Sequence, residues 1–146
     1  MINMYRKLAV AAVFFAPAMD VCSAAPAATE VVVKTTYGHI DAKGLKALMD
    51  TGTPMAIFDA RTDKWFKGKV IPGAQRLPSD STKDKIELAI PNKKTLIIAY
   101  CAGEMCDASK NLVAKLVENG YANVIDFHGG EREWKEQGYA IETWAK

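Results

Sequence analysis

The chain of 146 residues has little of what marks several classes of protein. Its formal net charge is only +2, and it has no block of lysine and arginine of the kind that follows a phosphate backbone. It holds only three cysteines and two histidines, and they do not form the closely spaced ligand pairs of a structural zinc site. We therefore predict no nucleic-acid partner, no metal site and no cofactor.

The chain also lacks a hydrophobic run that could span a bilayer, which would need roughly 20 residues. Its apolar run at 8–19, "LAVAAVFFAPAM", follows a basic start and precedes the small residues "CSAAPAA". This layout is typical of a secretory signal peptide, so we expect a periplasmic or secreted protein without stable membrane insertion after cleavage. The predicted parts are a signal peptide at 1–27, an N-terminal connection at 28–38 and one domain at 39–146.

Cleavage of this leader leaves two cysteines, Cys101 and Cys106, in the mature chain. In an oxidising compartment two thiols can pair, or they can be kept reduced for chemistry. They lie in the stretch "YCAGEMCDAS", after an apolar run and before a helical pattern. At this point they can be a nucleophile and its neighbour, a redox couple or two buried small residues.

Short apolar runs alternate with helical patterns along the mature chain. Strands are predicted at 55–60, 74–77, 95–100 and 122–127, and helices within 41–52, 80–94, 106–120 and 129–138. The segment 61–78 is interpreted as a turn-rich connection that contains the short second strand, and 139–146 as a tail. Strands that alternate with helices predict an α/β fold, with a central parallel sheet and helices on both faces.

The loop after the 95–100 strand is the predicted site. In an open α/β sheet, ligands bind beyond the carboxyl ends of the strands, and Cys101 follows this strand directly. Backbone N–H groups that curl into a helix N-terminus form an anion cradle, and Gly103 helps the chain to bend there. Such a setting lowers the pKa of a thiol, so we expect Cys101 to be exposed and reactive.

The segments "AIFDAR", "VIPGAQRLP", "LIIAYC" and "LVENGYANVIDFHGGEREWKEQGY" together resemble a small, single-domain rhodanese, over roughly residues 39–142. The resemblance implies a rhodanese fold and sulfurtransferase activity with thiosulfate or another sulfane-sulfur donor. It implies that Cys101 is the nucleophile, becomes a persulfide, and passes the sulfur to a small thiophilic acceptor or a thiol acceptor protein. A monomer is expected. The loop implied to hold the persulfide consists of Ala102, Gly103, Glu104, Met105, Cys106 and Asp107.

The loop departs from the family's pattern in its charges. Many active members have an arginine near the loop's end, where this chain has Cys106, with Glu104 and Asp107 close by. Two carboxylates near the site would repel a dianion and disfavour a thiolate, which makes thiosulfate a less secure donor. Related phosphatases need an arginine at the position of Asp107 to clamp phosphate, so phosphatase activity is not expected.

Cys106 has three interpretations. It can be a resolving thiol that attacks a persulfide on Cys101, releases sulfide and leaves a disulfide. It can form a reversible disulfide that protects Cys101 from overoxidation, or it can be a small residue packed at a helix start. Two alternative functions follow for the whole protein: a thiol-disulfide redox or sulfur-sensing protein that uses both cysteines, and an inactive rhodanese-fold binding module.

Arg61 and Lys110 are candidate anion contacts. Arginine binds anions in a bidentate manner, but Arg61 also matches the family's D-x-R pattern, in which an ion pair with Asp59 fixes the neighbouring loop. Lys110 falls in the first turn of the predicted helix, where it could offset the acidic loop. The other residues are predicted to be structural: packing aromatics (Trp65 and Trp134), a turn residue (His128) and a turn with positive φ (Gly129 and Gly130).

Overall fold

A computed structural model describes residues 37–145 of the chain. The predicted signal peptide and nearly all of the predicted connection lie outside these residues. Within the described part, no helix is long and apolar enough to cross a membrane.

Five parallel strands form the central sheet, in the order β1-β6-β5-β2-β4. Their bounds are Gly38–His39 (β1), Ala56–Asp59 (β2), Gln75–Arg76 (β4), Ile97–Tyr100 (β5) and Val124–Phe127 (β6). The middle strand, β5, is paired with β2 on one side and β6 on the other, and all four of its residues are buried. The predicted α/β class, the parallel sheet and the four predicted strands are confirmed.

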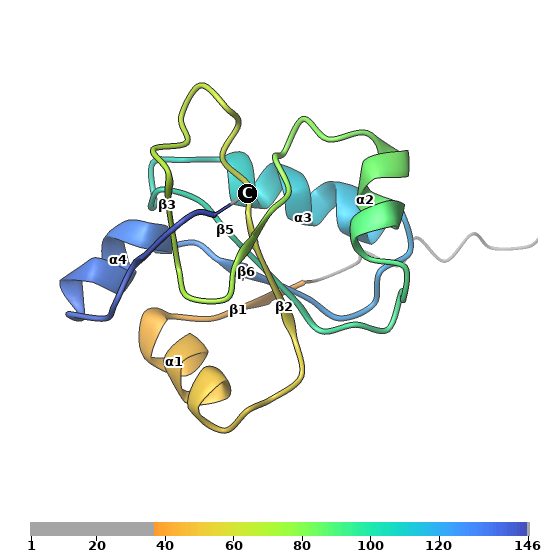
Figure 1. Ribbon diagram of the computed structural model, residues 1–146. Coiled ribbons are helices and arrows are strands. Elements are labelled where there is room, and N and C mark those ends of the chain that lie inside the picture. The colour runs from red at the N-terminus through yellow and green to blue at the C-terminus, as the bar shows by residue number, and fades with distance from the viewer. Residues whose placement is uncertain (1–36, 146) are drawn as a thin grey trace, which may run out of the picture. The chain divides into compact units, whose positions relative to one another are not determined.

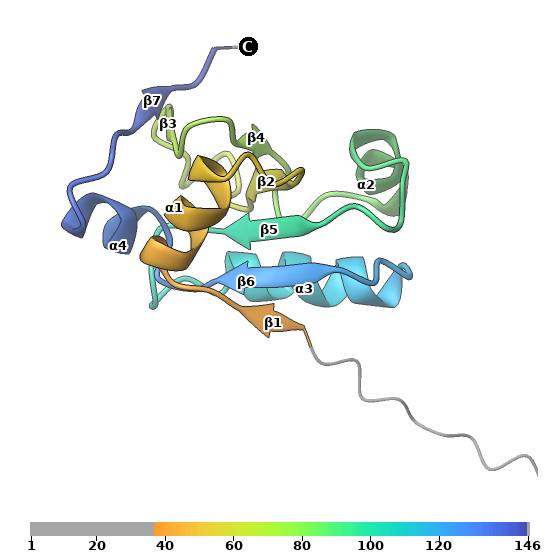
Figure 2. The ribbon, with the colours of Figure 1, turned by 90° about the horizontal axis from the view of Figure 1, so that it is seen from below.

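Two helices lie on each face of this sheet (Figures 1 and 2). α1 (Ala42–Asp50) and α4 (Gly130–Glu136) cover one face, and α2 (Lys83–Ala89) and α3 (Ala108–Glu118) cover the other. Side chains alternate across a strand, so each face has its own apolar cluster. On β5, Ile97 and Ala99 join the cluster of α2 and α3, whereas Ile98 and Tyr100 join that of α1 and α4.

Local signals determine where the helices begin. Asp41 caps α1, because its carboxylate accepts a 2.7 Å hydrogen bond from the Gly44 backbone N–H. The helix predicted within 106–120 starts at Ala108, since the chain first makes a turn in which the Cys106 N–H donates to the Gly103 carbonyl at 2.9 Å. Cys106 therefore belongs to the loop and lies before the helix.

The C-terminal segment, which was predicted as a tail, forms a second sheet. β7 (Glu142–Thr143) pairs antiparallel with β3 (Lys69–Val70), and the Lys69 ammonium donates to the Thr143 hydroxyl at 2.8 Å. The prediction missed both strands, because two-residue strands show no periodicity and the partners are 74 positions apart.

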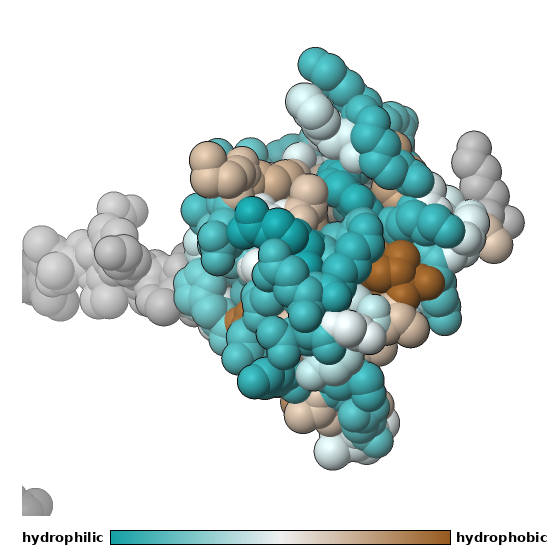
Figure 3. Space-filling view, turned by 90° about the vertical axis from the view of Figure 1, so that its left-hand side faces the viewer, coloured by the Kyte–Doolittle hydropathy of each residue, from teal (hydrophilic) through white to brown (hydrophobic). Residues whose placement is uncertain are grey.

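The two tryptophans predicted to be packing aromatics behave differently. Trp134 on α4 is 1% exposed and its indole N–H donates to the Ala140 carbonyl at 2.8 Å, which confirms the prediction. Trp65 is 61% exposed, so the prediction is wrong for it. It lies in a surface turn in which its N–H bonds to the Thr62 carbonyl at 2.9 Å. The face that carries α4 is mostly hydrophilic (Figure 3). On α4, Trp134 is buried, whereas charged neighbours such as Lys135 are exposed.

Candidate active site

Backbone hydrogen bonds join the loop that connects β5 to α3 to the beginning of α4. The Glu131 N–H donates to the Cys101 carbonyl at 2.9 Å, and the Arg132 N–H donates to the Ala102 carbonyl at 3.0 Å. Gly130 makes this close approach possible, because a Cβ at this position would collide with the Cys101 carbonyl and lie 2.8 Å from the Gly103 nitrogen. Its φ of +60° matches the predicted positive φ, whereas Gly129 has a φ of −61°, so the prediction is wrong for Gly129.

Cys101 directly follows β5 at the carboxyl end of the sheet, as expected, but its side chain is buried, with 0% exposure. The expectation of an exposed cysteine is therefore wrong. The loop folds over the sulfur, and the thiol donates to the Cys106 carbonyl at 2.9 Å and lies 3.6 Å from the Gly103 carbonyl. The bends that bring these carbonyls onto the thiol depend on the contacts with α4, which lie about thirty positions away along the chain.

The surroundings of Cys101 favour the neutral thiol. Burial raises the pKa of Cys101 above its ordinary value, and the side chain of Cys106 raises this pKa further. The backbone of Gly103 and both the backbone and hydroxyl of Ser109 lower it, but they do not outweigh burial. The expectation of a lowered thiol pKa at this helix N-terminus is therefore not met.

Ser109, three positions after Cys106, was not predicted to be a site residue, and the structure places it beside Cys101. Its side chain is 0% exposed in the first turn of α3, and its hydroxyl has no hydrogen-bond partner among the described residues. The hydroxyl nevertheless lowers the pKa of Cys101, so it lies where it could donate to a negatively charged sulfur.

Two cavities adjoin the loop in the described part of the chain. The larger, of about 620 Å³, is lined by the loop and by residues of the β2–β3 connection such as Trp65 and Lys67. The smaller, of about 320 Å³, lies between the loop and Arg132. Half-buried Cys106 lines both cavities, whereas Cys101 lines neither. Both cysteines carry free thiols.

The two acidic loop residues are each paired with a cation. Glu104 accepts a 3.2 Å bond from the Arg132 guanidinium, and the Asp107 carboxylate lies 3.7 Å from the Lys110 ammonium. These two pairs weaken the predicted repulsion of an anion. Lys110, which was predicted as an anion contact, is paired with Asp107. Arg132 approaches the loop from α4, and no charge pattern in the sequence indicated it, although its position after the Gly-Gly pair could have done so.

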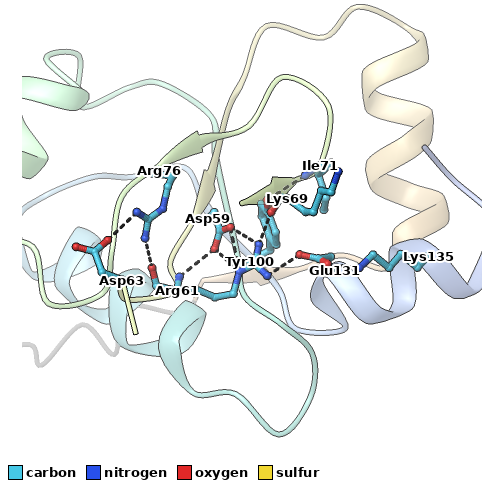
Figure 4. A network of polar contacts seen from close by, with 9 residues as sticks. All are labelled: Asp59, Arg61, Asp63, Lys69, Ile71, Arg76, Tyr100, Glu131 and Lys135. Atoms are coloured by element: carbon cyan, nitrogen blue, oxygen red, sulfur yellow. Dashed lines mark hydrogen bonds and ion pairs between the residues drawn. The ribbon is translucent and has the colours of Figure 1, made fainter. Parts of the chain in front are cut away.

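Arg61 lies in a buried network beside the larger cavity (Figure 4). Its guanidinium binds Asp59 with distances of 2.5 to 3.0 Å, lies 2.5 Å from a Glu131 oxygen, and donates to the Lys69 carbonyl at 2.6 Å. Burial alone would lower the pKa of Arg61, but Asp59 and Glu131 raise it above its ordinary value. Two carboxylates thus already bind this cation. The predicted ion pair between Arg61 and Asp59 is confirmed.

His128 lies in the turn after β6, as predicted for a turn residue. Its Nδ1 atom is 3.8 Å from a carboxylate oxygen of buried Asp126, and His39 Nδ1 approaches the same oxygen at 3.8 Å. Across the described residues, no group of three or more histidine, cysteine or acidic side chains could hold a metal ion.

A parallel α/β domain with a cysteine at the carboxyl end of its central strand, in a loop that leads into a helix, has the architecture expected of a rhodanese. The profile of the rhodanese-like domain matches residues 41–137. The chain therefore belongs to the rhodanese-like domain family. No curated protein matched it.

Solved structures agree with this assignment. The rhodanese-like domain of an Anabaena protein is 27% identical with a TM-score of 0.63, over 75% of this chain and 81% of its own. A rhodanese-like domain protein from Staphylococcus aureus is 27% identical with a TM-score of 0.57, and the match covers 74% of this chain and 99% of that protein. A thiosulfate sulfurtransferase from Pseudomonas aeruginosa is 23% identical with a TM-score of 0.62 over 75% of this chain, but only 21% of its own length is covered. This last likeness supports the shared fold and nothing further about this chain.

Proposed function

We propose that the protein is a sulfurtransferase that carries sulfane sulfur as a persulfide on Cys101 and passes it to a thiol or another thiophilic acceptor. The supporting observation is the placement of Cys101. It lies at the carboxyl end of the central strand of a rhodanese-like domain, in a loop folded around its sulfur and next to the first turn of α3.

The proposed reaction is a pair of nucleophilic displacements at sulfur. Cys101 loses its proton, and its thiolate attacks the sulfane sulfur of the donor. The donor's bond to that sulfur breaks, the leaving group keeps the electron pair, and Cys101 becomes a persulfide. An acceptor thiolate then attacks the outer sulfur, and Cys101 leaves as a thiolate that is protonated again. The Ser109 hydroxyl can donate to the sulfur of Cys101 whenever that sulfur is negative.

The donor is thiosulfate or another sulfane-sulfur compound. Glu104 and Asp107 oppose an anionic donor less than their number suggests, because each is paired and largely exposed to screening water. Lys67 brings positive charge to the wall of the larger cavity, whereas Arg132, which lines the smaller one, is already paired with Glu104 and Glu136.

Intact-mass spectrometry of the reduced protein tests this proposal. The protein is treated with thiosulfate and, separately, with inorganic polysulfide, alongside Cys101→Ser and Cys106→Ser. We expect a gain of one sulfur, about 32 Da, in the wild-type protein and in Cys106→Ser, and peptide mapping should find that sulfur on Cys101. Cys101→Ser can gain sulfur only on Cys106. Loss of the two thiol hydrogens without any sulfur gain, requiring both cysteines, would instead identify a redox protein. An unchanged mass with every donor would identify a binding module.

We also propose that the protein is exported to the periplasm or secreted. The support is the pattern at 1–27: a basic start, a short apolar centre and a small-residue cleavage site. Fractionation of expressing cells and N-terminal sequencing of the product test this. A mature N-terminus near Ala28 outside the cytoplasm is expected, and an intact Met1 in the cytoplasmic fraction would contradict it.

A further inference from the structure

The two thiols of the site differ in how a donor can reach them. Cys101 has 0% exposure and lines neither cavity, because the loop carbonyls of Gly103 and Cys106 lie against its sulfur. Cys106 is half-buried and lines both cavities. A donor in either cavity therefore meets Cys106, whereas a direct attack by Cys101 requires the loop to open first.

Cys101 also contacts Cys106 directly. The Cys101 thiol donates to the backbone carbonyl of Cys106 at 2.9 Å, and the side chain of Cys106 contributes to the raised pKa of Cys101. Both thiols are free, so neither is blocked by a disulfide. A sulfur atom bound to Cys106 would accordingly lie close to the sulfur of Cys101.

From this arrangement we propose that Cys106 is the residue through which sulfur reaches and leaves the buried Cys101. This inference rests on the proposed sulfurtransferase function and adds a second catalytic residue to it. The interpretation of Cys106 as a resolving thiol ends in a disulfide and released sulfide. In the relay proposed here, no disulfide forms and no sulfide is released.

The relay consists of two displacements at the same sulfur atom. The Cys106 thiolate attacks the sulfane sulfur of the donor, the donor's bond to that sulfur breaks, and the leaving group keeps the electron pair. Cys101 then attacks the outer sulfur of the Cys106 persulfide as a thiolate, and its proton passes to the departing sulfur of Cys106. The sulfur–sulfur bond to Cys106 breaks, and Cys106 leaves as a thiolate that takes up a proton. One sulfur has moved, and no oxidant or reductant is consumed. Delivery to an acceptor follows the reverse path.

Time-resolved mapping of the wild-type protein tests the order of events. The reduced protein is mixed with a limiting amount of inorganic polysulfide and quenched with iodoacetamide after increasing times. Cleavage after Glu104 separates the two cysteines into different peptides. We expect the additional sulfur on Cys106 at the earliest times and on Cys101 later. Sulfur that is found first on Cys101, with none on Cys106 at any time, would overturn the relay.

A rate comparison tests the relay independently. In Cys106→Ser, loading of Cys101 should slow by about tenfold or more, because the loop must open to expose the buried thiol, while the final extent stays the same. The control is Leu88→Ser, which introduces a serine at a side chain 86% exposed on α2 and should load at the wild-type rate.

The outcomes separate the relay from the function on which it rests. Loading of Cys101 in Cys106→Ser at the wild-type rate would overturn the relay and leave the sulfurtransferase intact. Absence of sulfur gain in the wild-type protein with every donor would overturn both. The mapping uses only wild-type protein, so it decides the question even where a cysteine variant folds poorly.

Discussion

The thiol of Cys101 is held in its protonated form by its surroundings. Burial and the neighbouring Cys106 raise its pKa, and only the thiolate reacts with an alkylating agent. We therefore expect alkylation of Cys101, followed by peptide mapping across a pH series, to rise at higher pH than for an ordinary cysteine, whose pKa is about 8.5. A profile whose midpoint lies below that value would contradict the assigned environment.

A second prediction at the residue scale concerns Ser109, whose hydroxyl lowers the pKa of Cys101. Ser109→Ala should shift the alkylation profile of Cys101 to still higher pH and slow persulfide formation at neutral pH. Stability should change little, since the hydroxyl has no other hydrogen-bond partner among the described residues. Ser81→Ala, at a buried serine before α2, serves as the control and should leave the profile unchanged. An unshifted profile in Ser109→Ala would exclude this role.

At the scale of elements, the approach of α4 to the loop depends on Gly130. In Gly130→Ala, the new Cβ would collide with the Cys101 carbonyl, and the residue would keep a positive φ. Gly138→Ala is the matched control, because Gly138 also has a positive φ, of +74°, but its Cβ would meet no atom within 4 Å. Urea unfolding should show a cost of about 1–2 kcal/mol for the control. Gly130→Ala should cost about 1–3 kcal/mol more, and should also impair sulfur loading. Equal losses of unfolding free energy in the two variants would show that the loop accommodates the added Cβ of Gly130→Ala without further cost.

At the scale of the whole molecule, Arg61 joins three separate parts of the fold. It binds Asp59 on β2, the Lys69 carbonyl on β3 and Glu131 on α4 (Figure 4). Arg61→Ala would leave buried Asp59 without its cation and Glu131 with Lys135 alone, so we expect it to lower the free energy of unfolding by about 3–5 kcal/mol. Adding Asp59→Asn should recover part of this loss, because the carboxylate left without a cation is then removed.

A surface ion pair provides the comparison for this network. Lys46 and Asp50 pair on α1 at 2.5 Å, with side chains that are 37% and 61% exposed, so Lys46→Ala should change the free energy of unfolding by less than about 1 kcal/mol. Chemical unfolding of Arg61→Ala, of the double variant and of Lys46→Ala measures the free energy of unfolding of each. If Arg61→Ala proved no more costly than Lys46→Ala, the buried network would not stabilise the molecule.

The sequence by itself determined the features that depend on neighbours along the chain. The period of apolar residues identified the strands and helices, their alternation predicted the parallel sheet, and Asp41 marked the start of α1. The position of Cys101 after β5 located the candidate site in the same way, and the order of motifs indicated the family that the comparisons show.

Only the tertiary structure decided what depends on residues far apart. The burial of Cys101 follows from a loop fastened to α4, and the pairing of Glu104 with Arg132 crosses 28 positions. The β3–β7 pairing spans 74 positions, and its short strands show no period of their own. Accessibility, pKa and charge pairing at this site are set by atoms that meet only when the chain folds, and local sequence patterns do not record which distant residues those are.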